Sequence, residues 1–169
     1  KIFSPYTITT ASIFFLPAKS KADHLLLENM EEGSGNYYFN LGINKSKNQN
    51  YYGAISDLMK AIETNELSKK RLSNAYFELG LLKSRIGDNF GALINYTKSI
   101  EINSKYPDVF YNRGIIKGKI GDFAGAISDY SKAIEINPKF QEAYFNRGFD
   151  KHELRELDGA ISDYSKAIE

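Results

Sequence analysis

The chain has 169 residues, of which 42% are hydrophobic and 25% are charged, a composition typical of a folded globular protein with a core of ordinary size. Its 22 Lys and Arg residues balance 21 Asp and Glu residues, so the net charge of +1 gives no electrostatic argument for binding nucleic acid. Cysteine is absent, which excludes disulfides, thiolate metal sites and a cysteine nucleophile.

Residues 1–22 differ in character from the rest of the chain. They begin with Lys1, contain a short apolar run around Ile13–Leu16, and end in the small-x-small pattern Ser20-Lys21-Ala22, which a signal peptidase could cut after Ala22. An export signal would place the protein in a periplasm or lumen. A leader without that role, or a short packed strand, would leave it in the cytoplasm. No segment is long and apolar enough to span a membrane as a mature helix.

Residues 23–35 link this leader to the rest of the chain. The stretch "DHLLLENMEE" predicts a short helix that covers the first of the units described next, with Leu25, Leu26 and Met30 facing inward.

An internal repeat organises residues 36–169. The stretch "GAISDYSKAIE" occurs twice, at Gly125–Glu135 and Gly159–Glu169, and two more divergent copies lie upstream. The units cover about 36–70, 74–107, 108–141 and 142–169, with spacings of 38, 34 and 34 residues. Two columns recur in all four units, a glycine and, 12 residues later, an alanine. The columns consist of Gly42, Gly80, Gly114 and Gly148, and of Ala54, Ala92, Ala126 and Ala160.

Each unit carries two helical patterns separated by a turn. In unit three the second half has apolar residues at i, i+1, i+4, i+7 and i+8, which form one face of a helix, and the Gly121-Asp122 pair precedes it as a turn signal. Two helices of about a dozen residues cannot bury their apolar faces alone, whereas stacked copies can. The sequence therefore predicts an all-α solenoid of about four helix-turn-helix units.

The repeat resembles the tetratricopeptide repeat (TPR) over residues 36–169. The resemblance rests on the 34-residue period, an aromatic–x–x–x–Gly pattern in the first helix, an Ala–x–x–x–Tyr–x–x–Ala pattern in the second, and Pro138 at the end of a unit. It implies a right-handed superhelix in which the glycine and alanine columns let the two helices cross closely. Leu58 and Ser99 depart from the pattern, and unit four lacks the Gly-Asp turn.

A comparison of the units predicts ion pairs between the two helices of a unit. Arg113 and Arg147 occur in the first helix of the units whose second helix carries Asp129 and Asp163. The sequence therefore predicts Arg113–Asp129 and Arg147–Asp163 pairs with a structural role.

The residues for catalysis are scarce. Only two histidines exist, His24 and His152, and they lie far apart in the chain, so neither a metal cluster nor a histidine-based triad is expected. The glycines lie at predicted helix crossings and turns, without a phosphate-loop lysine after them. We therefore expect a non-enzymatic protein without a metal or other cofactor, and His152 reads as a surface residue.

The resemblance implies that the concave surface, lined by the first helix of each unit, holds a protein or an extended peptide. An asparagine column at these helices could bind peptide groups through donor and acceptor together, although Glu78 interrupts it, and aromatic neighbours would add contact area. Phe39 and Ile43 stand where family members that bind acidic chaperone tails have Lys and Asn, which argues against that ligand. The predicted groove residues are Asn40, Phe77, Tyr111, Asn112, Phe145 and Asn146.

The last helix of the array suggests two other functions. No residues after Glu169 cover its apolar side, so Ile161, Tyr164 and Ile168 could mediate a homodimer. Alternatively, the chain is a fragment of a longer array or the non-catalytic part of a larger protein. The leading interpretation remains a protein-binding scaffold, and an exported assembly factor if the leader is an export signal.

Overall fold

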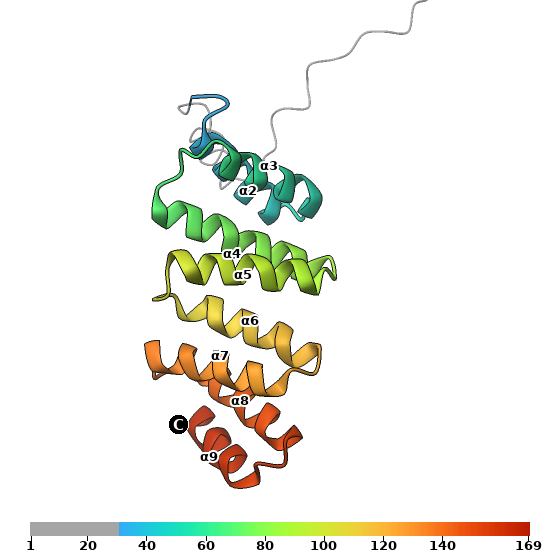
Figure 1. The fold of residues 1–169 in the computed structure, drawn as a ribbon, viewed down its shortest axis with the longest axis vertical. Coiled ribbons are helices and arrows are strands. Elements are labelled where there is room, and N and C mark those ends of the chain that lie inside the picture. The colour runs from blue at the N-terminus through green and yellow to red at the C-terminus, as the bar shows by residue number, and fades with distance from the viewer. Residues whose placement is uncertain (1–30) are drawn as a thin grey trace, which may run out of the picture.

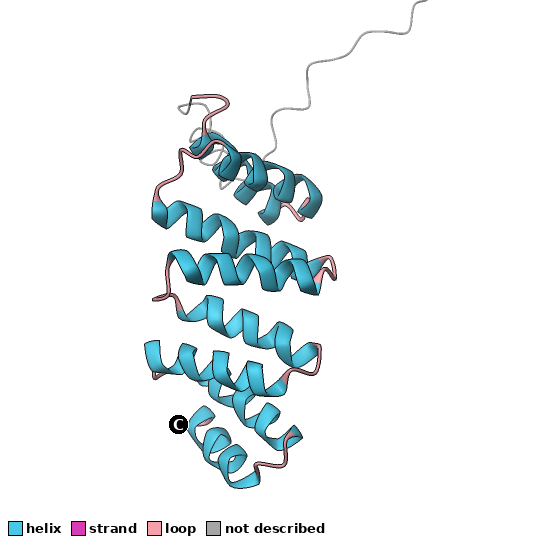
Figure 2. Cartoon of the chain, in the orientation of Figure 1, coloured by secondary structure: helices cyan, strands magenta, loops and turns pink. Residues whose placement is uncertain are grey.

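A computed structural model describes residues 31–169, which form eight α-helices and no strand (Figures 1 and 2). The predictions made for residues 1–22 and for a helix over residues 23–32 concern segments that lie outside, or almost wholly outside, the described residues. The helices are α2 (Gly35–Lys47), α3 (Tyr51–Glu63), α4 (Lys69–Arg85), α5 (Asn89–Ile102), α6 (Pro107–Lys119), α7 (Phe123–Ile136), α8 (Gln141–Glu153) and α9 (Leu157–Ala167).

The helices associate in four consecutive pairs that stack along the long axis of the molecule (Figure 1). Each pair is one sequence unit: α2 with α3, α4 with α5, α6 with α7, and α8 with α9. The first helices α2, α4, α6 and α8 also contact one another in succession, whereas no such contacts join the second helices. The stack therefore curves with the first helices on its inner face. The predicted all-α solenoid of four helix-turn-helix units is confirmed.

The glycine column lies where the two helices of a unit cross. A Cβ added to Gly114 would lie 2.7 Å from Cε1 of Tyr130, and one added to Gly148 would lie 3.1 Å from the ring of Tyr164. The four column alanines on the second helices are at most 2% exposed. The side chains at the crossings are therefore packed too closely for a larger residue to fit without a shift in the neighbouring ring.

The turns between paired helices need a residue with positive φ in every unit. Glycine occupies this position at Gly87 and Gly121, where φ is 83° and 85°. Gln49 and Arg155 adopt φ of 60° and 62° at the same position, which is costlier for a residue with a Cβ. The next residue caps the second helix: the side chains of Asn50, Asp88 and Asp122 each accept a hydrogen bond from a backbone N–H, whereas Glu156 makes no such bond.

Both predicted ion pairs are confirmed. Nε and Nη2 of Arg113 donate to the Asp129 carboxylate at 2.8 and 2.7 Å, and Arg147 binds Asp163 in the same way at 2.8 and 2.6 Å. The bidentate geometry and the burial of both aspartates, which are 3% exposed, make these contacts stronger than ordinary surface pairs.

The structure adds two partners to each arginine–aspartate pair, a lysine and a hydroxyl, which the sequence comparison did not identify. Lys117 and Lys151 reach Asp129 and Asp163 at 2.9 Å. The remaining guanidinium nitrogen of Arg113 donates to the Thr97 hydroxyl of the preceding unit at 3.0 Å, and Arg147 makes the equivalent bond to a serine. Each arginine therefore joins the helices of its own unit and also holds that unit to the one before it.

Candidate functional site

The predicted asparagine column lies on the inner helices, and its members make different contacts. Nδ2 of Asn112 donates to the backbone carbonyl of Asp108, one turn earlier in α6, at 2.8 Å. Nδ2 of Asn146 in α8 donates to the Tyr111 hydroxyl of α6 at 3.1 Å, so this amide links two units. Asn40 is half-buried on α2. The amide oxygens of Asn112 and Asn146 accept no hydrogen bond from the described residues and are open to a donor from a ligand.

The three predicted aromatic groove residues differ in exposure. Phe145 on α8 is 55% exposed, and Phe149, one turn later, is 49% exposed. Tyr111 is half-buried and packs on the ring of Phe140, with the centroids 4.7 Å apart. Phe77 is only 9% exposed and belongs to the core between units two and three, which leaves little of its ring for a partner. The accessible part of the predicted site is therefore the surface of α6 and α8.

Carboxylates lie near four tyrosines of units two and three, namely Tyr96, Tyr106, Tyr111 and Tyr130. Burial raises the pKa of each of these phenols, and a nearby carboxylate raises it further because a second negative charge would be repelled. The neighbours are Glu78 for Tyr96 and Tyr106, with Asp108 also near Tyr106, Glu142 for Tyr111, and Asp150 for Tyr130. The inner helices of units two to four therefore carry carboxylates, at Glu78 on α4, Asp108 on α6, and Glu142 and Asp150 on α8.

One of these carboxylates, Asp150, was not singled out from the sequence. It is 4% exposed on α8 and borders a cleft of about 230 Å³ that also includes Asn146 and Phe149. Burial, and to a lesser extent the negative charge of Glu153, raises the pKa of Asp150 to about 6. A column comparison could have found it, because the same position holds Leu82 in unit two and Ile116 in unit three.

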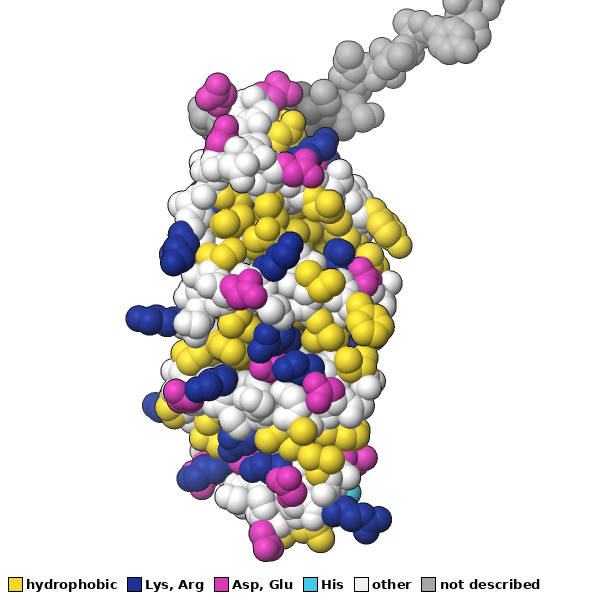
Figure 3. All heavy atoms as spheres, in the orientation of Figure 1, with side chains coloured by type: hydrophobic (Ala, Val, Ile, Leu, Met, Phe, Trp, Pro, Cys, Tyr) yellow, Lys and Arg dark blue, Asp and Glu magenta, His cyan; other side chains and the backbone are white. Residues whose placement is uncertain are grey.

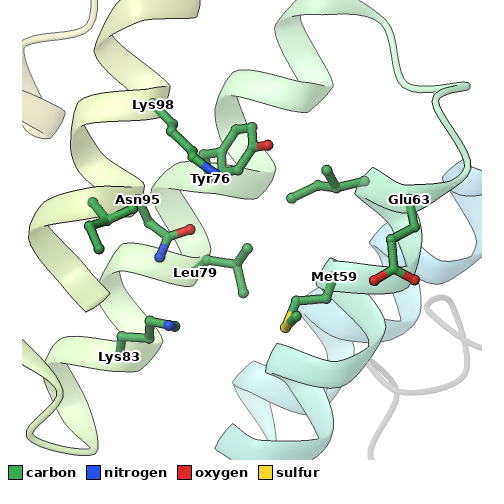
Figure 4. Close-up of a pocket in the computed structure, with 9 residues that line it drawn as sticks. Met59, Glu63, Tyr76, Leu79, Lys83, Asn95 and Lys98 are labelled. Carbon is green, nitrogen blue, oxygen red and sulfur yellow. The ribbon is translucent and has the colours of Figure 1, made fainter. Parts of the chain in front are cut away.

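A second cleft, of about 280 Å³, lies between units one and two on the outer side, where α3 and α5 face each other (Figure 4). Met59, Leu79 and Tyr76 line it together with Asn95 and Lys83. Hydrophobic side chains gather in a broad area between α3 and α4 on the face shown in Figure 3.

This outer cleft is open because unit two lacks the arginine network of the later units. Leu79 stands at the position of Arg113, Met59 at that of Thr97, and Asn95 at that of Asp129. The arginine–aspartate contact of the later units is therefore missing here, and the guanidinium groups that cross this junction are those of Arg71 and Arg85, which lie over the rings of Phe39 and Tyr51 at 5.5 and 5.7 Å. Lys83, whose counterparts bind buried aspartates, pairs instead with the more exposed Asp88 at 3.3 Å.

The residues predicted for self-association lie at the end of the array. Ile161 is 65% exposed and Ile168, which follows the last residue of α9, is 87% exposed. Tyr164 is half-buried and packs on Phe145 with ring centroids 5.6 Å apart, so its ring already has a partner within the chain. The homodimer stays a prediction.

Within residues 31–169, no group of three or more potential His, Asp or Glu ligands is close enough to hold a metal ion. His152 is largely exposed, with its side chain 60% accessible. None of the helices in this range is both long enough and apolar enough to cross a membrane.

Comparisons with known proteins agree with this architecture. Residues 107–140 match the sequence model of the tetratricopeptide repeat family. The sequence has no match among curated proteins. A crystal structure of MamA superposes with a TM-score of 0.76 at 25% identity, over 88% of this chain and 84% of that one. The structure of YrrB, described as a TPR protein with an unusual peptide-binding site, gives a TM-score of 0.74 at 17% identity, over 89% and 78% of the two chains.

A third similar structure contains a ligand. The first TPR of Spaghetti (RPAP3), bound to the HSP90 peptide SRMEEVD, gives a TM-score of 0.56 at 27% identity, over 57% of this chain and 76% of that chain. The repeat period, the paired helices, the glycine crossings and these similarities lead to one conclusion: the chain has the fold of a tetratricopeptide repeat solenoid, and its residues 107–140 match that family.

Proposed function

We propose that the protein is a non-catalytic scaffold that binds an extended segment of another protein on the inner face of α6 and α8. The observation that carries this proposal is the exposure of Phe145 and Phe149 on α8, where Phe149 borders the same cleft as Asn146 and α8 contacts α6, the helix of Asn112. Exposed aromatic rings supply apolar contact area, and amides bind the peptide groups of a partner without regard to its sequence. The solved complex of RPAP3 with an HSP90 peptide supports this use of the fold.

The chemistry of the surface limits both affinity and ligand type. A hydrogen bond contributes about 0.5–1.5 kcal/mol net, and ordering an extended peptide opposes binding, so we expect affinity of about micromolar or weaker. The acidic groups along the inner face disfavour an acidic segment such as SRMEEVD. We therefore propose a partner other than an acidic chaperone tail.

A display library of random short peptides, selected against the full chain, tests the proposal. Peptides selected by the wild type should bind Phe145→Ala at least about tenfold more weakly, because a large exposed ring at the centre of a contact carries much of its energy. Phe90→Ala is the matched control, since Phe90 is 74% exposed on the outer helix α5. Equal losses in both variants, or no loss in Phe145→Ala, would contradict the proposed surface.

Self-association through α9 is a second candidate, favoured by the exposure of Ile161 and Ile168. Light scattering over a dilution series should show a dimer that Ile161→Glu abolishes. A concentration-independent monomer would rule it out. Ile161 is the better position for this test than Tyr164, whose ring packs within the chain.

Export of the protein is a separate proposal. It rests on residues 1–22, which lie outside the described residues, and would make the scaffold an assembly factor of a periplasm or lumen. Cleavage after Ala22 in cells, measured by the mass of the mature chain, is the test. A role as part of a larger protein likewise stays a prediction.

A further inference from the structure

The side chain of Asp150 is the only buried carboxylate of units three and four without a cationic partner among the described residues. It is 4% exposed, and its Oδ2 has no hydrogen-bond partner in the part of the chain that the structure describes. By contrast, Asp129 and Asp163, which are similarly buried, each bind one arginine and one lysine. A buried charge without a partner is costly, so its presence in a folded protein needs an explanation.

The position of Asp150 holds a hydrocarbon side chain in units two and three, and asparagine (Asn44) in unit one. Leu82 and Ile116, at the same place in units two and three, are 0% and 1% exposed and belong to the core. The neighbouring helix accommodates the carboxylate through a glycine, because a Cβ added to Gly118 would lie 3.2 Å from Oδ2 of Asp150. Unit four has therefore exchanged a core contact for an acidic group that borders open space.

That space is a cleft of about 230 Å³ between α6 and α8, on the inner face. It is smaller than the pockets of about 300–1,000 Å³ that take drug-sized molecules, and suits a single long side chain. Ile115 and the half-exposed ring of Phe149 form its apolar walls, and Asp150 lies at its polar end. Among the charged groups near Asp150, Glu153 adds negative charge and Lys119, exposed on α6, borders the cleft without an ion pair to Asp150.

We propose that this cleft takes a lysine or arginine side chain of the bound protein segment, with its aliphatic stem along Phe149 and Ile115 and its cation on the Asp150 carboxylate. The stems of these residues pack well on apolar surfaces while their charged ends seek a counter-ion. The cation also satisfies the Oδ2 atom that no group within residues 31–169 satisfies. This inference rests on the proposed function, because it names the side chain that the inner surface of α6 and α8 selects.

The test compares peptides selected from the random library by three forms of the full chain: the wild type, Asp150→Asn and Glu153→Gln. The first variant removes the charge with little change in shape. The second removes the same charge three residues away on α8, from a side chain that is 41% exposed, and so controls for the overall electrostatic field. Thermal melting of each variant confirms folding.

We expect the wild type to enrich Lys or Arg at one peptide position, and Glu153→Gln to do the same. The Asp150→Asn variant should lose this preference and bind a selected basic peptide at least about tenfold more weakly. Its binding of the same peptide with norleucine in place of the basic residue should not change.

Peptides selected without a basic preference, or a preference that survives Asp150→Asn, would overturn the inference and leave the proposed function intact. An equal loss in both variants would also overturn it, because the effect would then be that of the general field. If no form of the protein selects any peptide, the proposed function fails and the inference fails with it.

Discussion

Replacement of Asp150 by asparagine should stabilise the protein at neutral pH, in contrast to most changes at buried polar positions. The pKa of Asp150 is raised from 3.8 to about 6. A shift of about two pKa units means that burial costs the charged form about 3 kcal/mol, and solvent in the adjoining cleft reduces this cost. We therefore expect Asp150→Asn to raise the free energy of unfolding by about 1–2 kcal/mol. Asp150→Leu should gain at least as much, because Leu82 fills the same position in unit two without exposure.

The effect must depend on pH in a defined direction. Above the folded pKa of about 6, the carboxylate is ionised in both the folded and unfolded states, and the full cost of burying the charge is present. As the pH falls from about 6 toward about 4, the folded state takes up a proton before the unfolded state does, and the cost disappears. The stability difference between Asp150→Asn and the wild type should therefore shrink over this range.

Asp163 supplies a control of opposite sign. Burial acts to raise its pKa, but the hydrogen bonds and charges of Arg147 and Lys151 outweigh burial and lower it. Asp163→Asn should therefore destabilise the protein at neutral pH, and this loss should diminish only as the pH falls through the lowered pKa. Urea unfolding of the full chain at several pH values measures both variants. A less stable Asp150→Asn at neutral pH, or a difference that does not change with pH, would refute the reasoning.

Three further predictions concern the repeat itself, all measured by urea unfolding. Gly114→Ala should cost about 1–3 kcal/mol, because the added Cβ would meet a buried tyrosine ring at 2.7 Å; an unchanged midpoint would show that the crossing can relax. The double substitution Arg155→Gly and Glu156→Asp gives unit four the Gly-Asp turn of units two and three. It should raise the free energy of unfolding by about 1–2 kcal/mol, because glycine adopts the positive φ without strain and aspartate caps α9. A lower free energy of unfolding would mean that the Arg155 and Glu156 side chains make contacts that outweigh the better turn. Ser73 and Ser99 are fully buried and bond to each other, so a double-mutant cycle to alanine should show coupling of about 1 kcal/mol, and additive effects would contradict a shared hydrogen-bond network.

Much of the candidate site could be expected from the sequence, but not its exposure. The pattern placed Phe77, Tyr111 and Phe145 in one column, and the structure exposes mainly the third. Phe77 is covered because Tyr106, from the loop before α6, packs on its ring with centroids 5.2 Å apart. The repeat pattern identifies equivalent backbone positions, but the loops and neighbouring units that cover each position differ.

The amino-acid sequence by itself determined the repeat period, the pairing of helices and the Arg113–Asp129 and Arg147–Asp163 bonds. These features depend on residues close together in one unit; the period and the helix pairing recur in all four units, and the arginine–aspartate pair recurs in units three and four. Only the tertiary structure showed that Asp150 lacks a cationic partner within the described range 31–169 and that the junction beside Leu79 is open. Both features arise between units that are no longer identical, where side-chain volumes and charges from three or four helices must match. Whether these volumes and charges match depends on how the helices pack, because no single stretch of the sequence contains all of the residues involved.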